Sequence, residues 1–154
     1  MTLNEILVKQ NILTPILLKD GDNELSKELK VKIVRLRIAY NKIKKQFDDE
    51  VQEFTANLIP EELKSLQAIP ENERTEEDTQ KILQLVDKVN SEYREFLTQK
   101  GKEEVQLSSN DAFTEKEFDE IVMVNAGNEV TINGNVVKAE DLMESFYSVF
   151  VNKD

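Results

Sequence analysis

The chain of 154 residues contains no cysteine, histidine or tryptophan, and it has only four glycines and three prolines. Without cysteine it can form neither a disulfide nor a metal–thiolate site, and without histidine it lacks the usual base of a nucleophilic active site. No apolar stretch approaches the roughly 20 residues that a bilayer requires, and the first residues lack the pattern of a signal peptide. These absences favour a non-enzymatic protein without a membrane segment, and we expect it in the cytoplasm.

Motifs for nucleophilic catalysis or phosphate binding are also missing, and each of the four glycines falls where a turn or a helix end is expected. The acidic turn at residues 20–24 is the one cluster that suggests a cation. An EF-hand starting at Asp20 would need glycine at its sixth position and glutamate at its twelfth, and these positions are Leu25 and Val31. We therefore predict no catalytic residue, no cofactor and no metal ion.

The hydrophobic periodicity is predominantly helical. Apolar residues between 24 and 58 advance in steps of three or four, which predicts one long helix. The members of this stripe are Leu25, Leu29, Ile33, Leu36, Tyr40, Ile43, Phe47, Val51, Phe54 and Leu58. A second helix is predicted from Thr75, which has capping-box spacing to Asp78, to Gly101, expected in the left-handed C′ position. Two such helices joined by a short segment fold back as an antiparallel hairpin.

Shorter elements flank these helices. Thr2 and Glu5 have capping-box spacing, so a first helix is predicted to begin there and to end before Pro15. After the second long helix, residues 105–107 suggest a short strand, and a helix is predicted after Thr114. A last helix is predicted from residue 139, with Leu142, Phe146, Val149 and Phe150 on one face.

The clearest local signal is a β-hairpin at residues 129–138. Asn133-Gly134 supplies the two positive-φ residues of a type I′ turn. This turn fixes the register, which pairs Ile132 with Asn135, Thr131 with Val136, Val130 with Val137 and Glu129 with Lys138.

The predicted class is mainly α (α+β): a long antiparallel helical hairpin with a small C-terminal β-hairpin and helix region docked on it. We predict an apolar N-terminal arm over residues 1–22, the helical hairpin over 23–101 and the small α/β region over 102–154, folded together as one cooperative unit.

Charge is unevenly distributed along a chain whose net charge is -11. Residues 27–45 hold eight basic residues and one acidic residue. The candidate basic patch comprises Lys30, Lys32, Arg35, Arg37, Lys42, Lys44 and Lys45. It could contact nucleic acid, but the segment lacks aromatic residues spaced for base stacking. The favoured interpretation is complementarity within the chain, with Asp87, Glu92 and Glu95 of the second helix beside it, or contact with a protein partner.

The first helix is longer than its predicted partner, so part of its apolar stripe is expected to need another cover. The candidate interaction surface is made of Leu25, Leu29, Val51, Phe54, Leu58, Phe146 and Phe150. Because closed two-fold pairing is the commonest form of association, we expect a homo-oligomer.

The order of these features, with the basic–apolar run at residues 29–40, Phe47-Asp48-Asp49-Glu50 and Val105-Gln106-Leu107, resembles small uncharacterised proteins encoded among the accessory or morphogenesis genes of tailed bacteriophages. The resemblance implies a phage protein with a binding or structural role, in the host cytoplasm or in the virion, and it assigns no functional residue.

We therefore predict a non-enzymatic phage structural or accessory protein that acts through protein–protein contacts in virion assembly. One alternative is an acidic inhibitor of a host nucleic-acid-binding or defence protein. A second is a nucleic-acid binder that uses basic residues 27–45.

Overall fold

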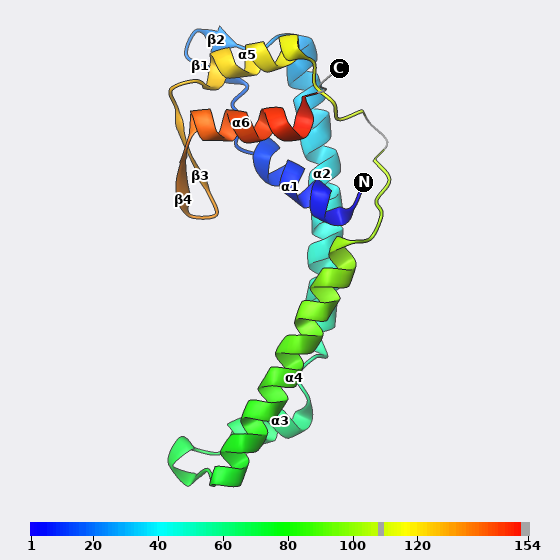
Figure 1. Ribbon diagram of the computed structural model, residues 1–154, viewed down its shortest axis with the longest axis vertical. Helices are drawn as coiled ribbons and strands as arrows, with labels where there is room; N and C mark the ends of the chain where they lie inside the picture. Colours follow the sequence, from blue (N-terminus) through cyan, green and yellow to red (C-terminus); the bar gives the residue numbers. More distant parts are fainter. Residues whose placement is uncertain (108–109, 152–154) are drawn as a thin grey trace. The chain divides into compact units, whose positions relative to one another are not determined.

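A computed structural model describes residues 1–107 and 110–151 (Figure 1). In chain order its elements are α1 (Leu3–Leu13), β1 (Lys19–Asp20), β2 (Asn23–Glu24), α2 (Lys27–Ala56), α3 (Glu61–Gln67), the 3-10 turn η1 (Glu71–Glu73), α4 (Glu76–Gly101), α5 (Glu115–Asn125), β3 (Glu129–Ile132), β4 (Asn135–Lys138) and α6 (Ala139–Phe150). The strands form two separate antiparallel pairs, β1–β2 and β3–β4. The predicted class, mainly α with a small β part, is confirmed. Within the described ranges no helix is long and apolar enough to cross a membrane.

The chain divides into two compact units, and the division falls inside α2. Unit 1 joins Met1–Lys44 to the C-terminal segment that begins at Glu104, and unit 2 is Lys45–Glu103. This differs from the predicted arm, hairpin and C-terminal region with boundaries at residues 22 and 101. The predicted arm and the predicted C-terminal region belong to the same unit because both pack on the first half of α2.

The core of unit 1 gathers apolar side chains from both ends of the sequence. Helix α6 contacts both α1 and α5, and lies between them in Figure 1. The first half of α2 contributes Leu29, Ile33, Leu36 and Tyr40, all at most 2% exposed. An aromatic cluster fills the centre, where the ring of Phe113 lies 5.0 Å from Phe146 and 5.5 Å from Phe150, both edge-on. Burial of this many large side chains makes unit 1 the main hydrophobic core.

Three helix starts follow the predicted local chemistry. Thr2 with Glu5, Thr75 with Asp78 and Thr114 with Glu117 each form a complete capping box. In each box the threonine hydroxyl accepts the N–H of the third helical residue, and the acid accepts the threonine N–H. The predicted starts of α1, α4 and α5 are confirmed.

The β3–β4 hairpin is confirmed in every predicted pair. Glu129 lies opposite Lys138, and the two-residue turn closes the pair Ile132–Asn135. Asn133 has φ 50° and Gly134 has φ 80°, as a type I′ turn requires. The inner face of the hairpin packs against the core of unit 1.

Two local predictions need correction, and a third site has more structure than predicted. Gly101 is the last residue of α4 and does not have positive φ, because the helix continues to a C-cap at Lys102. Residues 105–107 form no strand; the preceding Glu104 makes an isolated bridge with Thr2, and the Val105 N–H donates to the Met1 carbonyl at 2.8 Å. The turn expected at residues 20–24 is present at Gly21-Asp22, where Gly21 has φ 60°, and the short β1–β2 ladder on both sides of it was not predicted.

Unit 2 is the antiparallel pair formed by the second half of α2 and by α4, with α3 beside α4. The rings of Phe54 and Phe96 stack with centroids 4.1 Å apart. One end of the pair carries the ion pair Lys100–Glu50 at 2.6 Å, and α3 is tied to α4 by Lys81–Glu62 at 2.6 Å. The predicted helical hairpin is present, but only the second half of α2 takes part in it.

Candidate functional site

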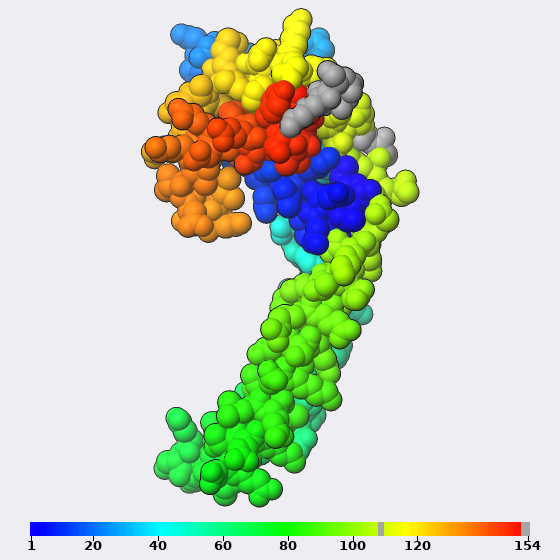
Figure 2. Space-filling view, viewed as in Figure 1, coloured from blue at the N-terminus to red at the C-terminus, as the bar shows by residue number. Residues whose placement is uncertain are grey.

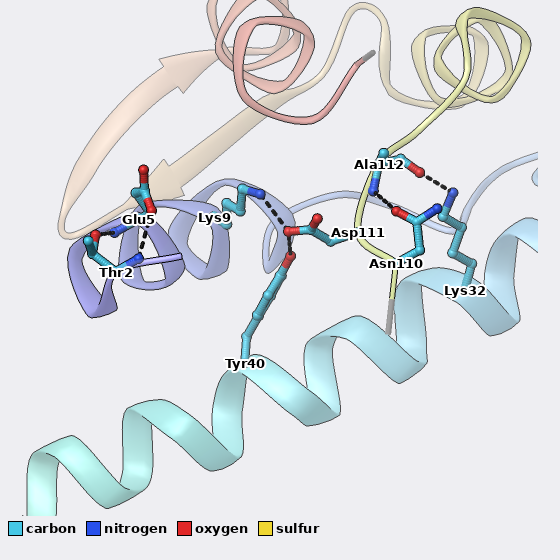
Figure 3. A network of polar contacts seen from close by, with 8 residues as sticks. All are labelled: Thr2, Glu5, Lys9, Lys32, Tyr40, Asn110, Asp111 and Ala112. Atoms are coloured by element: carbon cyan, nitrogen blue, oxygen red, sulfur yellow. Dashed lines mark hydrogen bonds and ion pairs between the residues drawn. The ribbon is translucent and has the colours of Figure 1, made fainter. Parts of the chain in front are cut away.

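The most concentrated polar cluster of unit 1 joins α1, α2 and the segment before α5 (Figure 3). The Lys9 ammonium lies 2.5 Å from Oδ2 of Asp111, and the Tyr40 hydroxyl donates to the same oxygen at 3.0 Å. The Tyr40 side chain is fully buried, and burial together with the neighbouring Asp111 raises the pKa of its hydroxyl far above the usual range. A tyrosine held protonated in this way is a hydrogen-bond donor and not a base, so the cluster suits a structural role.

A second polar contact lies along the same segment. The Lys32 ammonium donates to the Ala112 carbonyl at 2.5 Å, pairs with Glu117 at 3.0 Å and lies 4.2 Å from the centroid of the Phe113 ring. Burial opposes ionisation of Glu117, but the Thr114 N–H and the Lys32 ammonium together hold the pKa of this carboxyl below its usual range. Lys32 therefore anchors the start of α5 to α2.

The predicted basic patch does not form one continuous surface. Lys30 pairs with Glu24, and Lys32 pairs with Glu117. The Arg37 guanidinium donates to the carbonyls of Leu13, Thr14 and Ile16, at the end of α1. Burial lowers the pKa of Arg37, in keeping with a guanidinium that serves the fold. Arg35, Lys42 and Lys45 are exposed, and Lys44 is half-buried with a polar interaction of its own.

The prediction that acidic residues of the second long helix complement this patch is wrong, because α4 pairs with the second half of α2. Phe54 stacks on Phe96, so Glu92 lines a hollow beside Asn57 and Leu58 in unit 2. Glu24 and Glu117 of unit 1 pair with Lys30 and Lys32 of the basic segment. Complementarity within the chain does occur, but its partners come from the predicted turn and the C-terminal region and not from the second long helix.

The predicted interaction surface is largely interior. Leu25, Leu29, Phe146 and Phe150 are at most 3% exposed and belong to the core of unit 1, so they form no contact surface. The reason is that α1, α5 and α6 cover the first half of the stripe on α2.

Val51, Phe54 and Leu58 are half-buried in unit 2. Phe54 and Leu58 line an open hollow of about 480 Å³ whose wall includes Glu50, Glu53 and Glu92. Leu25 and Leu29 at one end of the stripe are buried, and Phe54 near the other end stacks on Phe96. The difference in length between the two helices is therefore no argument for a homo-oligomer.

An apolar groove between α5 and α6 was not predicted. Phe118 and Val122 come from α5, Ala126 is the C-cap residue of that helix, and Met143 and Tyr147 come from α6. The groove encloses about 480 Å³, and Glu140 and Glu144 form its rim. At one end the Tyr147 hydroxyl donates to Glu115 at 2.5 Å. Figure 2 shows α5 in yellow and α6 in orange to red, side by side on the surface of unit 1.

The sequence does contain a signal for this groove. Phe118 and Val122 are four residues apart, which aligns them on one helix face, and Ala126 follows at the C-cap of that helix. Of the apolar residues Phe118, Ile121 and Val122 of α5, only Ile121 is fully buried. The groove depends on the packing of α5 against α6, and residues 126–138 separate these two helices in sequence.

The outer side of α2 in unit 1 carries a second apolar feature. Val31, Val34 and Ile38 are 41%, 40% and 64% exposed, and they lie on one helix face opposite the buried stripe. Arg35 and Lys42 are exposed along one flank of this face. We call Val31, Val34, Ile38, Arg35 and Lys42 the α2 ridge.

The described residues include no group of three or more acidic side chains arranged to hold a metal ion. Comparisons of the chain with protein-family models, with curated proteins and with solved structures find no match. The functional argument therefore depends on the surfaces of the chain itself.

Proposed function

We propose that the protein is a non-enzymatic binding protein that acts through protein–protein contacts, and that the α5/α6 groove is its binding site. The partner contributes an amphipathic helix whose apolar side is flanked by lysine or arginine. Particle assembly in a phage is the setting that we propose for this contact, on the strength of the sequence resemblance alone.

The observation that supports the proposal is the combination of an apolar floor with an acidic rim. Val122, Phe118 and Tyr147 are only half-buried, so the chain leaves apolar area at the groove that a partner could cover. Of the described residues that line the groove, two are glutamates and none is basic. A helix laid in such a groove inserts side chains spaced three or four residues apart, and basic flanks would meet Glu140 and Glu144.

The size of the groove also suits a helix. From Phe118 to its C-cap at Ala126, α5 extends about 12 Å, at a rise of about 1.5 Å per residue. This length corresponds to two turns of a partner helix, enough for three apolar anchors.

The test uses a fluorescent helical peptide with leucines on one face and lysines on its flanks, and fluorescence anisotropy measures its binding. We expect the peptide to bind the wild-type chain, and a matched peptide with glutamate in place of lysine to bind at least about tenfold more weakly. Glu140→Lys combined with Glu144→Lys should reverse this preference, because both side chains are exposed and their replacement leaves the core intact.

Leu83→Glu is the control, because Leu83 is 64% exposed on α4 of unit 2 and lies outside the groove. Equal binding of the lysine and glutamate peptides to the wild-type chain, or no binding of either, would refute the proposed function.

A further inference from the structure

The α2 ridge has the chemistry that the α5/α6 groove requires of its occupant. Its three apolar side chains, Val31, Val34 and Ile38, are spaced three and four residues apart, as the anchors of a helix in a groove are. Arg35 and Lys42 place positive charge along one flank. The groove has negative charge along its α6 side, at Glu140 and Glu144.

The two features also match in length. From Val31 to Ile38 the ridge extends about 10 Å, and the α6 side of the groove, from Glu140 to Tyr147, also extends about 10 Å, at about 1.5 Å per residue. β-branched residues such as valine and isoleucine lose little conformational entropy when buried, because their χ1 angle is already restricted. The ridge is thus a short, stiff apolar strip that fits the open floor of the groove.

Within one chain the ridge and the groove do not cover each other. Both belong to unit 1, and there Ile38 remains 64% exposed while the groove stays open. The buried stripe of α2, with Ile33 and Leu36, faces the core, so the ridge on the opposite side of the helix points away from it. Only a second molecule can bring a ridge to a groove.

We infer that the occupant of the α5/α6 groove is the α2 ridge of a second copy of this chain. The inference rests on the proposed function, since it names the partner of the same groove. The contact joins two different surfaces, so each chain still has one free ridge or one free groove after pairing. Copies therefore add head to tail, into a ring if the rotation closes and into a filament if it does not.

Nucleic acid fits the ridge less well than a protein does. Three β-branched apolar side chains occupy the middle of the ridge, and burying them against phosphates would gain nothing. Three further basic side chains of the first half of α2, Lys30, Lys32 and Arg37, already contact groups of their own chain.

Analytical ultracentrifugation of two variants of the full chain tests the inference. Each variant carries a substitution in one of the two contacting surfaces. Ile38→Glu removes the ridge, and Val122→Lys places a positive charge in the groove. We expect wild-type chains to associate increasingly with concentration, and each variant to raise the dissociation constant at least about tenfold. Leu83→Glu is the matched control, because Leu83 is also 64% exposed, and it should associate like the wild type.

Mixing the two variants gives the most specific outcome. The intact groove of the Ile38→Glu chain accepts the intact ridge of the Val122→Lys chain, and growth then stops because the remaining surfaces are defective. The mixture should therefore form a dimer with one chain of each kind. If Val122→Lys lowers the helical circular-dichroism signal, Glu140→Lys combined with Glu144→Lys takes its place, since both glutamates are exposed.

A wild-type chain that stays monomeric at every concentration, or a mixture that forms no mixed dimer, would overturn the inference. If the lysine-flanked peptide still binds the groove, the proposed function survives and only the second copy is excluded. If Arg35→Glu combined with Lys42→Glu abolishes binding to a duplex DNA probe and leaves sedimentation unchanged, the ridge belongs to nucleic acid and the inference also fails.

Discussion

The side-chain amide of Asn125 pairs with the backbone of Leu17 in both directions. Its Oδ1 accepts the Leu17 N–H at 2.8 Å, and its Nδ2 donates to the Leu17 carbonyl at 3.2 Å. The same nitrogen donates to the Ile121 carbonyl at 2.8 Å. Asn125 is 2% exposed and ends α5, so it fixes the segment after α1 against the end of α5.

Asn125→Ala should lower the free energy of unfolding by about 2–3 kcal/mol, because it leaves the Leu17 N–H and carbonyl without these partners. Urea denaturation followed by circular dichroism measures the change. Asn90→Ala is the control: Asn90 is exposed on α4, and its replacement should change stability by no more than about 0.5 kcal/mol. Equal effects of the two substitutions would show that the Asn125–Leu17 pair adds nothing.

Gly134→Val should destabilise the protein by about 1–3 kcal/mol, because a β-branched residue resists the positive φ of this turn position. Gly134→Asn should be much milder, since asparagine tolerates the left-handed region. Apart from the two neighbouring residues in the chain, nothing lies within 4 Å of a Cβ added at residue 134, so the difference between the variants isolates the backbone effect. Thermal unfolding of both variants checks this, and equal melting temperatures would contradict the type I′ assignment.

Stability should fall at acid pH because Glu24 and Glu117 are paired with lysines in the folded state. The hydrogen bond from Lys30 lowers the pKa of Glu24. Burial opposes ionisation of Glu117, but its bonds to Thr114 and Lys32 leave its pKa below the usual value. A carboxyl whose pKa is lowered on folding stabilises above its unfolded pKa and loses that contribution as pH falls through its folded pKa.

The melting temperature should therefore stay constant between about pH 6 and pH 8, where no histidine titrates, and should fall below about pH 5. Glu117→Gln is the matched variant, because glutamine can still complete the capping box with Thr114 but carries no charge. Its acid transition should be shallower than that of the wild type. An unchanged melting temperature from about pH 7 to pH 3 would rule out these ion pairs as a source of stability.

Phe54 and Phe96 should show a favourable coupling energy of about 0.5–1.5 kcal/mol, because their rings stack within unit 2. A double-mutant cycle with Phe54→Leu, Phe96→Leu and both together, measured by thermal unfolding, gives this energy. Additive effects of the two substitutions would mean that the rings do not stack in solution. The sequence alone suggested Phe54 as a free contact residue, for which no coupling is expected.

Helix caps and the hairpin were predictable because their chemistry is local. The box of Thr114 with Glu117 needs two residues three positions apart, and it forms wherever the chain enters a helix. The turn at Asn133-Gly134 sets the register of the strands that it joins, so the pair Glu129–Lys138 follows without knowledge of the rest of the molecule. Gly101 shows the limit of such signals, because the helix continued through it to Lys102.

The sequence by itself determined which residues form helices, where most of the helices begin, and which residues of α2 lie on one stripe. Only the tertiary structure decided what covers each side chain: Leu25 and Phe146 became core, Val31 and Ile38 stayed exposed, and α5 and α6 enclosed a groove. The physical reason is that periodicity fixes the direction of a side chain relative to its own helix axis. Burial depends on which distant segment packs against that face, and in unit 1 these segments come from opposite ends of the chain.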